Sequence, residues 1–292
     1  MLEFAYERPE TLADAVAAMR GGEARALAGG TDLIPQLREG RRAARRIIDL
    51  KRVPELTAIA SLADGGVSIG AAASATAIAQ HPSVAKSYPA VASSARLIGS
   101  LQVQNRASLG GNICNAAPSA DAVPALICHA ARAVVAGPGG RRELDLEALF
   151  AGPGRTTLTP GEILVAILLP PAPPRSAASY LRFTPRREMD IAVAGAGVWI
   201  ALGDNGTIAA ARVTLASVGP TPLRAPSAEA RLVGEMPSPD LIEEAGRLAA
   251  RDARPISDTR GSADYRRTLV AVLTARALTD CRRALAAGDS PQ

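Results

Sequence analysis

The chain has 292 residues, of which 48% are apolar, and this is enough material for one large globular domain or two ordinary ones. Its formal net charge of +5 comes almost entirely from arginine, but the arginines are scattered among acidic residues, and aromatic residues make up only 3% of the chain. Nucleic-acid binding needs clustered cations interleaved with stacking aromatics, so the composition argues against it.

Membrane insertion and metal binding are also disfavoured. No run of about 18 uninterrupted apolar residues is present, and the start, Met1–Arg8, lacks the charged-then-apolar order of a signal peptide. The few cysteines and histidines are too far apart for a zinc site, an iron–sulfur site or a histidine-based triad. These residues are Cys114, Cys128, Cys281, His81 and His129. We therefore expect a cytoplasmic protein that does not span a membrane, with free thiols, no metal site and no catalytic residue of its own.

The first part of the sequence alternates short apolar strands with short helices. Apolar residues at helical spacing predict helices, and short apolar runs bounded by turn residues predict strands. The expected helices are 10–19, 31–39, 89–98 and 122–129, and the expected strands are 24–27, 46–50, 67–70, 131–136 and 164–169. This mixed pattern predicts an α+β fold.

A proline-rich run, Pro170–Pro174, divides the sequence, because consecutive prolines cannot continue a helix or a sheet. We place a domain boundary there, with domains at 1–173 and 174–292. The second domain is expected to contain strands 178–183, 191–202 and 207–218, followed by helices 225–233, 239–253 and 263–287. Asp204-Asn205-Gly206 is typical of a hairpin turn, so these strands predict a three-stranded antiparallel sheet covered by helices.

The segment Leu27–Pro35 contains a Gly-Gly turn between an expected strand and an expected helix. Such a turn directs backbone N–H groups to one place, where they can hold a phosphate, and glycine lets the ligand approach the backbone closely. The same pattern is also common as a purely structural turn, and Thr31 and Asp32 are ordinary residues for the start of a helix.

The segment Ser108–Asp121 contains a second Gly-Gly pair, which is followed by a run of small and polar residues. We interpret it as a loop that lies close to an extended ligand. Two such loops indicate a dinucleotide held from both sides. The Rossmann fingerprint is absent, because Gly195-Ala196-Gly197 is followed by Ile200 in place of the third glycine and reads as an apolar strand.

Both glycine segments resemble the two FAD loops of the flavin subunits of molybdenum hydroxylases, the family of xanthine dehydrogenase and carbon monoxide dehydrogenase. Further segments resemble the same family in the same order along nearly the whole chain. They are Asp49–Leu56, Pro160–Leu164, Arg187–Ala192 and Ser257–Arg267. The resemblance implies a FAD-binding domain of the vanillyl-alcohol-oxidase type, built from two α+β subdomains, followed by a three-stranded antiparallel sheet with a helix bundle.

The resemblance also implies which residues bind FAD. Backbone amides of the two glycine segments are expected to hold its pyrophosphate and ribityl oxygens. These segments supply Ala28, Gly29, Gly30, Thr31, Asp32 and Leu33, and Ser108, Leu109, Gly110, Gly111 and Asn112.

Single residues outside the two glycine segments complete the implied FAD site. Asp121 is expected to accept hydrogen bonds from FAD, Leu164 to contact it, and Arg182 and Ile98 to lie near the flavin ring. Leu164 is equally consistent with a core leucine, and Arg182 with a solvated cation at a strand end.

The implied function is that of an electron-transfer subunit. In this family a large molybdopterin subunit oxidises the substrate, a small subunit carries two [2Fe–2S] clusters, and FAD passes the electrons to an external acceptor. The resemblance implies a dimer of such heterotrimers. A stand-alone flavin oxidase and a scaffold subunit without FAD are the alternatives.

Overall fold

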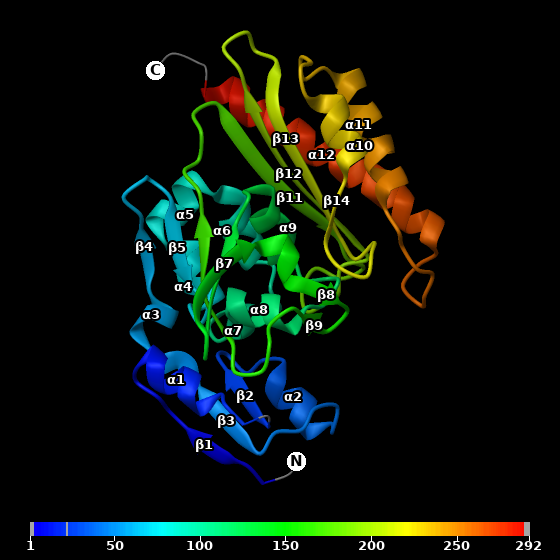
Figure 1. The fold of residues 1–292 in the computed structure, drawn as a ribbon. Helices are drawn as coiled ribbons and strands as arrows, with labels where there is room; N and C mark the ends of the chain where they lie inside the picture. Colours follow the sequence, from blue (N-terminus) through cyan, green and yellow to red (C-terminus); the bar gives the residue numbers. More distant parts are fainter. Residues whose placement is uncertain (1–2, 22, 289–292) are drawn as a thin grey trace.

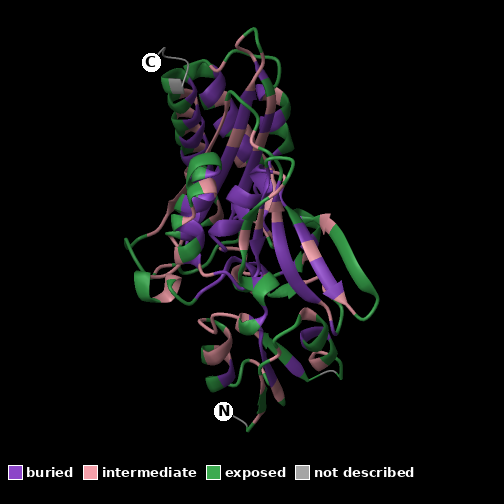
Figure 2. Cartoon of the chain, turned by 90° about the vertical axis from the view of Figure 1, so that its left-hand side faces the viewer, coloured by how far each residue is buried: buried purple, intermediate pink, exposed green. Residues whose placement is uncertain are grey.

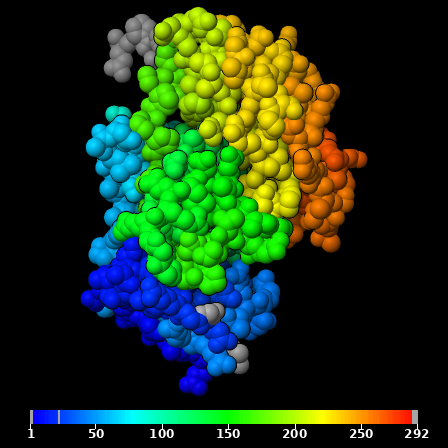
Figure 3. Space-filling model, in the orientation of Figure 1, coloured from blue at the N-terminus to red at the C-terminus, as the bar shows by residue number. Residues whose placement is uncertain are grey.

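Three regions, each built around a sheet, follow one another along the molecule (Figure 1). The structure is a computed structural model, and it describes residues 3–21 and 23–288. The N-terminal region lies at one end, the middle region in the centre, and the C-terminal strands and helices at the other end, as the colour bands of the space-filling view also show (Figure 3).

The N-terminal region is a parallel three-stranded sheet with one helix after each of its first two strands. The strands pair in the order β1-β3-β2. They are β1 (Ala5–Glu7), β2 (Ala24–Leu27) and β3 (Arg46–Asp49), and the helices are α1 (Leu12–Ala18) and α2 (Leu33–Arg38). Ile47 and Ile48 of the central strand β3 are fully buried, one on each face of the sheet.

The middle region contains an antiparallel five-stranded sheet, in the order β4-β5-β10-β6-β7, and most of the short helices. Its strands are β4 (Ile59–Ser61), β5 (Val67–Gly70), β6 (Arg132–Gly137), β7 (Gly140–Asp145) and β10 (Ile163–Leu169), with a separate pair β8 (Phe150–Gly152) and β9 (Arg155–Thr156). Its helices are α3 (Pro54–Thr57), α4 (Ala75–Gln80), α5 (Pro82–Ser87), α6 (Pro89–Ala95), α7 (Leu101–Gln104), α8 (Leu109–Asn115) and α9 (Ala122–Cys128). The central strand β10 is almost entirely buried, as its continuous apolar sequence predicts.

The C-terminal region confirms the three predicted antiparallel strands and adds a short fourth one. The strands are β11 (Ser176–Phe183), β12 (Ala194–Leu202), β13 (Ile208–Ala216) and the two-residue edge strand β14 (Leu223–Arg224). The helices are α10 (Pro226–Leu232), α11 (Pro239–Asp252) and α12 (Ala263–Gly288). Gly206 has a positive φ of 78° in the turn between β12 and β13, which fits the predicted hairpin.

Both faces of the C-terminal sheet are covered, and buried residues run along its strands (Figure 2). Helices α10 and α12 pack on one face, with α11 packed against both of them, whereas α6 and α9 of the middle region pack on the other face. A Cβ at Gly197 would lie only 3.0 Å from a backbone atom of Pro124 in α9. The Gly195-Ala196-Gly197 sequence therefore belongs to an apolar strand, as expected, and its second glycine permits close helix packing.

One expectation for the middle region is wrong. The second glycine segment was expected to be a loop, but residues Leu109–Asn115 form helix α8. Among the described residues, no helix is both long enough and apolar enough to cross a membrane.

Candidate functional site: a cleft between two glycine segments

The first glycine segment lies between β2 and α2, and its two glycines are required for different steric reasons. Gly30 has a positive φ of 76°, which glycine adopts without strain. A Cβ at Gly29 would lie 1.9 Å from the carbonyl oxygen of Arg106, so only glycine allows this approach. Asp32 occupies the position before α2, but its side chain makes no capping hydrogen bond. The loop is thus pressed against the chain just before the second glycine segment.

The backbone amides of the first segment are available to a ligand. Within residues 3–21 and 23–288, no hydrogen bond is donated by the amides of Gly29, Gly30, Thr31 and Asp32. These residues also line a cleft of about 410 Å³. Converging free N–H groups are a common way to bind phosphate oxygens. The first segment therefore has the donors that the sequence analysis expects of it.

The second segment differs from the expectation, because most of its amides are already used. Gly110 N–H donates to the carbonyl oxygen of Ala71 at 3.0 Å, Gly111 N–H to Ser108 Oγ at 3.0 Å, and Asn112 N–H to the Ser108 carbonyl at 3.0 Å. The last two bonds belong to a helix start with Ser108 as its cap, whereas the first is a tertiary contact. What this segment offers instead is a side chain: Asn112 Oδ1 is buried without a hydrogen-bond partner.

The two segments face each other across a cleft of about 410 Å³. Loops after β2 and β9 and the helix α8 form most of its wall. The predicted residues in this wall are Ala28, Gly29, Gly30, Thr31, Asp32, Leu33, Ile98, Ser108, Gly110, Gly111, Asn112 and Leu164. Leu109 does not line it, because its side chain is fully buried in the core. Leu164 is both a buried strand residue and a residue of the cleft wall, and its contact with FAD stays a prediction.

Asp121 and Arg182 lie outside the cleft wall and form a buried cluster with Tyr180. Arg182 forms an ion pair with Asp121, and the Tyr180 hydroxyl donates to Asp121 Oδ1 at 2.9 Å. Burial raises the pKa of Asp121 to about 6, although Arg182 and the Tyr180 hydrogen bond act in the opposite direction. The ion pair with Arg182 favours the ionised form of this carboxyl. The alternative of a solvated Arg182 is wrong, because only 7% of its side chain is exposed.

Three residues without a predicted role support the cleft, and two of them connect its walls. Gln36 Nε2 in α2 donates to Asn115 Oδ1 in α8 at 3.1 Å, which joins the two sides of the cleft. Lys51 donates to the carbonyl of Ala28 in the first glycine segment. Lys51 is one of only two lysines in the chain and lies in the Asp49–Leu56 segment that resembles the family, and these two signals could have identified it.

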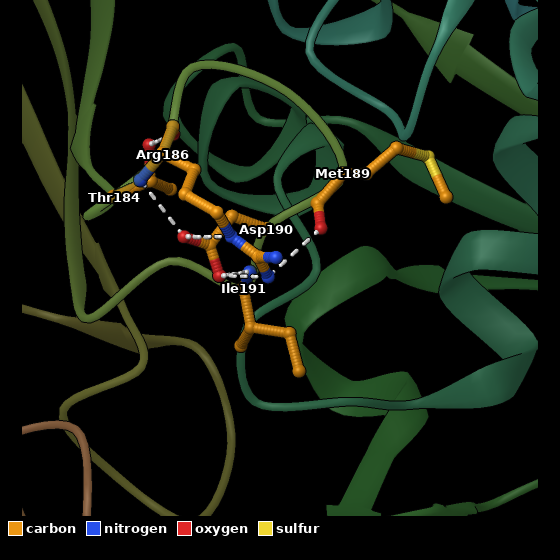
Figure 4. Close-up of polar contacts among 5 residues, drawn as sticks. All are labelled: Thr184, Arg186, Met189, Asp190 and Ile191. Atoms are coloured by element: carbon orange, nitrogen blue, oxygen red, sulfur yellow. Dashed lines mark hydrogen bonds and ion pairs between the residues drawn. The ribbon is translucent and has the colours of Figure 1, made fainter.

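The charged segment before β12 forms an ordered loop (Figure 4). Asp190 accepts hydrogen bonds from the backbone N–H and the guanidinium of Arg186, and from the Ile191 amide. Thr184 adds a bond to the Arg186 carbonyl at 2.6 Å. Met189 has a φ of 52°, and the side chains of Met189 and Ile191 project away from the loop and are exposed.

Comparison with known proteins identifies the family. Residues 2–172 match the FAD-binding domain of molybdopterin dehydrogenases, and residues 179–281 match the C-terminal domain of CO dehydrogenase flavoproteins. The chain belongs to the FAD-binding subunits of the molybdenum hydroxylases. In the part of this FAD-binding subunit that the structure describes, no His, Cys, Asp or Glu side chains gather in a group that could hold a metal ion.

Individual relatives support this assignment over almost their entire length. The FAD-binding subunit is 32% identical to a putative xanthine dehydrogenase FAD-binding subunit of Escherichia coli, covering 96% of this chain and 97% of that one. It is 32% identical to the carbon monoxide dehydrogenase medium chain of Hydrogenophaga pseudoflava, covering 94% and 96%. The solved CO dehydrogenase from H. pseudoflava superposes with a TM-score of 0.92 at 32% identity over 97% of this chain and 98% of that one. Quinoline 2-oxidoreductase from Pseudomonas putida superposes with a TM-score of 0.90 at 27% identity over 97% and 98%.

The cleft of this FAD-binding subunit fits the cofactor of its family. Its first glycine segment offers free N–H groups for an anionic pyrophosphate, and its glycines leave no side chain in the way. The buried Asn112 Oδ1 lacks a donor within the described chain. A buried acceptor without a partner is costly, and a donor group of the cofactor can supply the missing bond.

Proposed function

We propose that this FAD-binding subunit transfers electrons within a molybdenum hydroxylase complex in the cytoplasm. Electrons reach its FAD from the [2Fe–2S] clusters of a small iron–sulfur subunit and leave to an external acceptor, while a large molybdopterin subunit oxidises the substrate. Two such heterotrimers form the complete complex. The observation that carries the proposal is the similarity, over the whole chain, to proteins named as CO dehydrogenase medium chains and a xanthine dehydrogenase FAD-binding subunit.

In this proposal the residues of the chain bind and orient the cofactor. Bound FAD supplies the redox chemistry, since a flavin can exchange electrons singly or in pairs. The amides of Gly29–Asp32 hold the pyrophosphate, and Asn112 accepts one hydrogen bond from the cofactor. Ile98 and Leu164 give the cleft apolar surface. No side chain acts as a nucleophile or a general base.

Asp121 is proposed to accept hydrogen bonds from FAD, and Arg182 to lie near the flavin ring. They lie together at the contact between α9 and the C-terminal sheet, where Arg182 holds Asp121 in a fixed position. An ionised buried pair contributes a fixed local field, which is one way a protein adjusts the reduction potential of a bound cofactor.

Reconstitution with partner subunits tests the proposal. The isolated chain should bind FAD and accept electrons from an artificial reductant, yet oxidise no organic substrate. The assembled complex should reduce the FAD of this chain once substrate is added. Substrate turnover by the isolated chain at the rate of the complex would support a stand-alone oxidase instead. A purified chain whose absorbance spectrum shows no flavin, even after incubation with FAD, would support a scaffold subunit.

A further inference from the structure

Lys51 holds the first glycine segment from behind. Its Nζ donates hydrogen bonds to the carbonyl oxygen of Ala28 at 2.8 Å and to Asp49 Oδ1 at 2.6 Å. Asp49 is buried at the end of β3, and it also accepts hydrogen bonds from the Lys51 amide and from the Tyr6 hydroxyl of β1. Two strands of the N-terminal sheet and the turn that follows them thus converge on a single carbonyl of the loop.

The network around Asp49 is ionic. Burial raises the pKa of Asp49, but hydrogen bonds from Lys51 and Tyr6 outweigh it, and the pKa is lowered overall. The side chain of Lys51 is only 28% exposed, and that of Asp49 only 7%. Charge-assisted hydrogen bonds of this kind are shorter and stronger than neutral ones, so Lys51 is firmly placed.

The bond to Ala28 also orients the peptide that follows. In a trans peptide unit, the carbonyl of one residue and the N–H of the next point in opposite directions. The Ala28 carbonyl points at Lys51, so the Gly29 N–H points away from it and is not used by this network. Gly29 also rests against the backbone of Arg106, where no Cβ could fit. The loop is therefore fixed at two adjacent points.

The fixed position of the first glycine segment matters, because the free N–H donors of the cleft are concentrated in this segment. The amides of Gly110, Gly111 and Asn112 are committed to bonds within the protein, whereas those of Gly29–Asp32 are not. We propose that Lys51 is a positioning residue for FAD, which fixes the first glycine segment so that its free amides face the pyrophosphate. Lys51 itself does not line the cleft, so in this proposal it acts through the loop that it holds. The inference rests on the FAD binding that the proposed function also requires.

Variants of the two lysines test this role in the full-length chain. Lys51→Met keeps most of the side chain but removes the donor, Lys51→Arg keeps a cationic donor, and Lys86→Met is the control on the exposed helix α5. The FAD-free chains are titrated with FAD by flavin fluorescence, and their thermal unfolding is measured without FAD. We expect the Lys51→Met chain to bind FAD about tenfold more weakly, as expected for loss of a charged hydrogen bond. The Lys51→Arg and Lys86→Met chains should stay within about threefold of the parent.

These outcomes distinguish a role of Lys51 in positioning the first glycine segment from a role in folding of the chain. Unchanged thermal unfolding of FAD-free Lys51→Met together with weaker FAD binding supports the proposal, and so does recovery of affinity in Lys51→Arg. Parental affinity in Lys51→Met overturns it. Loss of cooperative unfolding in Lys51→Met also overturns it, because Lys51 would then serve the fold itself. If the unchanged chain binds no FAD, the proposed function fails as well.

Discussion

Replacing Gly111 by leucine should weaken FAD binding without weakening the fold. Gly111 is exposed in the cleft wall, and a Cβ there would meet only Ser108 Oγ, at 3.1 Å. It lies in the first turn of α8, where leucine is a better helix former than glycine by up to about 1 kcal/mol. The FAD-free chain should therefore unfold at the same temperature or about 2 °C higher. Forcing a side chain into space that the cofactor needs costs about 1–3 kcal/mol, which weakens FAD binding about 5- to 150-fold.

A second glycine in open space provides the matched control. Gly139 lies in the exposed turn between β6 and β7, where a Cβ would meet nothing within 4 Å. FAD affinity is measured by fluorescence titration, and stability by thermal unfolding of the FAD-free chains. Gly139→Leu should bind FAD as the parent does. If Gly111→Leu also binds FAD with parental affinity, Gly111 does not face the cofactor and the assignment of the cleft is wrong.

Two further predictions concern FAD attachment and acid stability. FAD should be bound non-covalently, because burial raises the pKa of the cleft thiol Cys114 to about 12 and leaves it a poor nucleophile. Acid precipitation of the protein should therefore leave the flavin in solution. A yellow protein pellet would contradict this prediction. Burial lowers the pKa of His129 to about 4, so the unfolded chain takes up a proton below pH about 6.5 and the folded chain does not. Stability should fall by up to about 3 kcal/mol as the pH drops from about 6.5 to about 4. Urea unfolding of His129→Leu should show less of this loss, and an identical pH dependence in parent and variant would refute the assignment.

Strong sequence patterns predicted the longer regular elements, whereas several short ones were not predicted, namely β1, β4, β7, β8, β9, α3, α4, α5 and α7. The strands Ala24–Leu27 and Val67–Gly70 have the predicted limits, because each is a short apolar run between turn residues. Strand β12 begins at Ala194 rather than at 191, since Asp190 binds Arg186 and closes a loop just before it. The two-residue strand β14 was missed, because so short a strand has no period to detect.

The helix α8 was missed for a different reason. Its Gly-Gly pair and the small, polar residues after it were interpreted as a loop beside a ligand, and glycine does lower helix propensity. In the structure a Cβ at Gly110 would lie 2.4 Å from the carbonyl oxygen of Ala71, so this glycine serves close packing inside a helix. The Ser108 cap was a usable signal for the helix start. Contacts across the tertiary structure decided the outcome, and a single sequence does not reveal them.

The candidate site was predicted in part. The first glycine segment could be recognised as a binding loop from its own short sequence, and its residues do line the cleft. The pairing of Asp121 with Arg182 joins residues 61 positions apart, and the support of Ala28 by Lys51 joins residues 23 positions apart. Neither pair follows a periodic pattern, so only the fold brings them together.

The shared covering of the C-terminal sheet limits how this protein can be divided or recombined. Helices α6 and α9 belong to the FAD-binding part of the chain, yet they cover one face of β11, β12 and β13. A cut at Pro170–Pro174 would expose that apolar face on one fragment and the matching helices on the other. A chimera with the C-terminal part of a relative would bring foreign side chains against Pro124, where a Cβ at position 197 would lie only 3.0 Å from a backbone atom and the helix would have to shift. A segment exchanged between relatives must therefore include α6 and α9 together with the C-terminal sheet. The two parts of the chain are thus constrained to evolve as one unit.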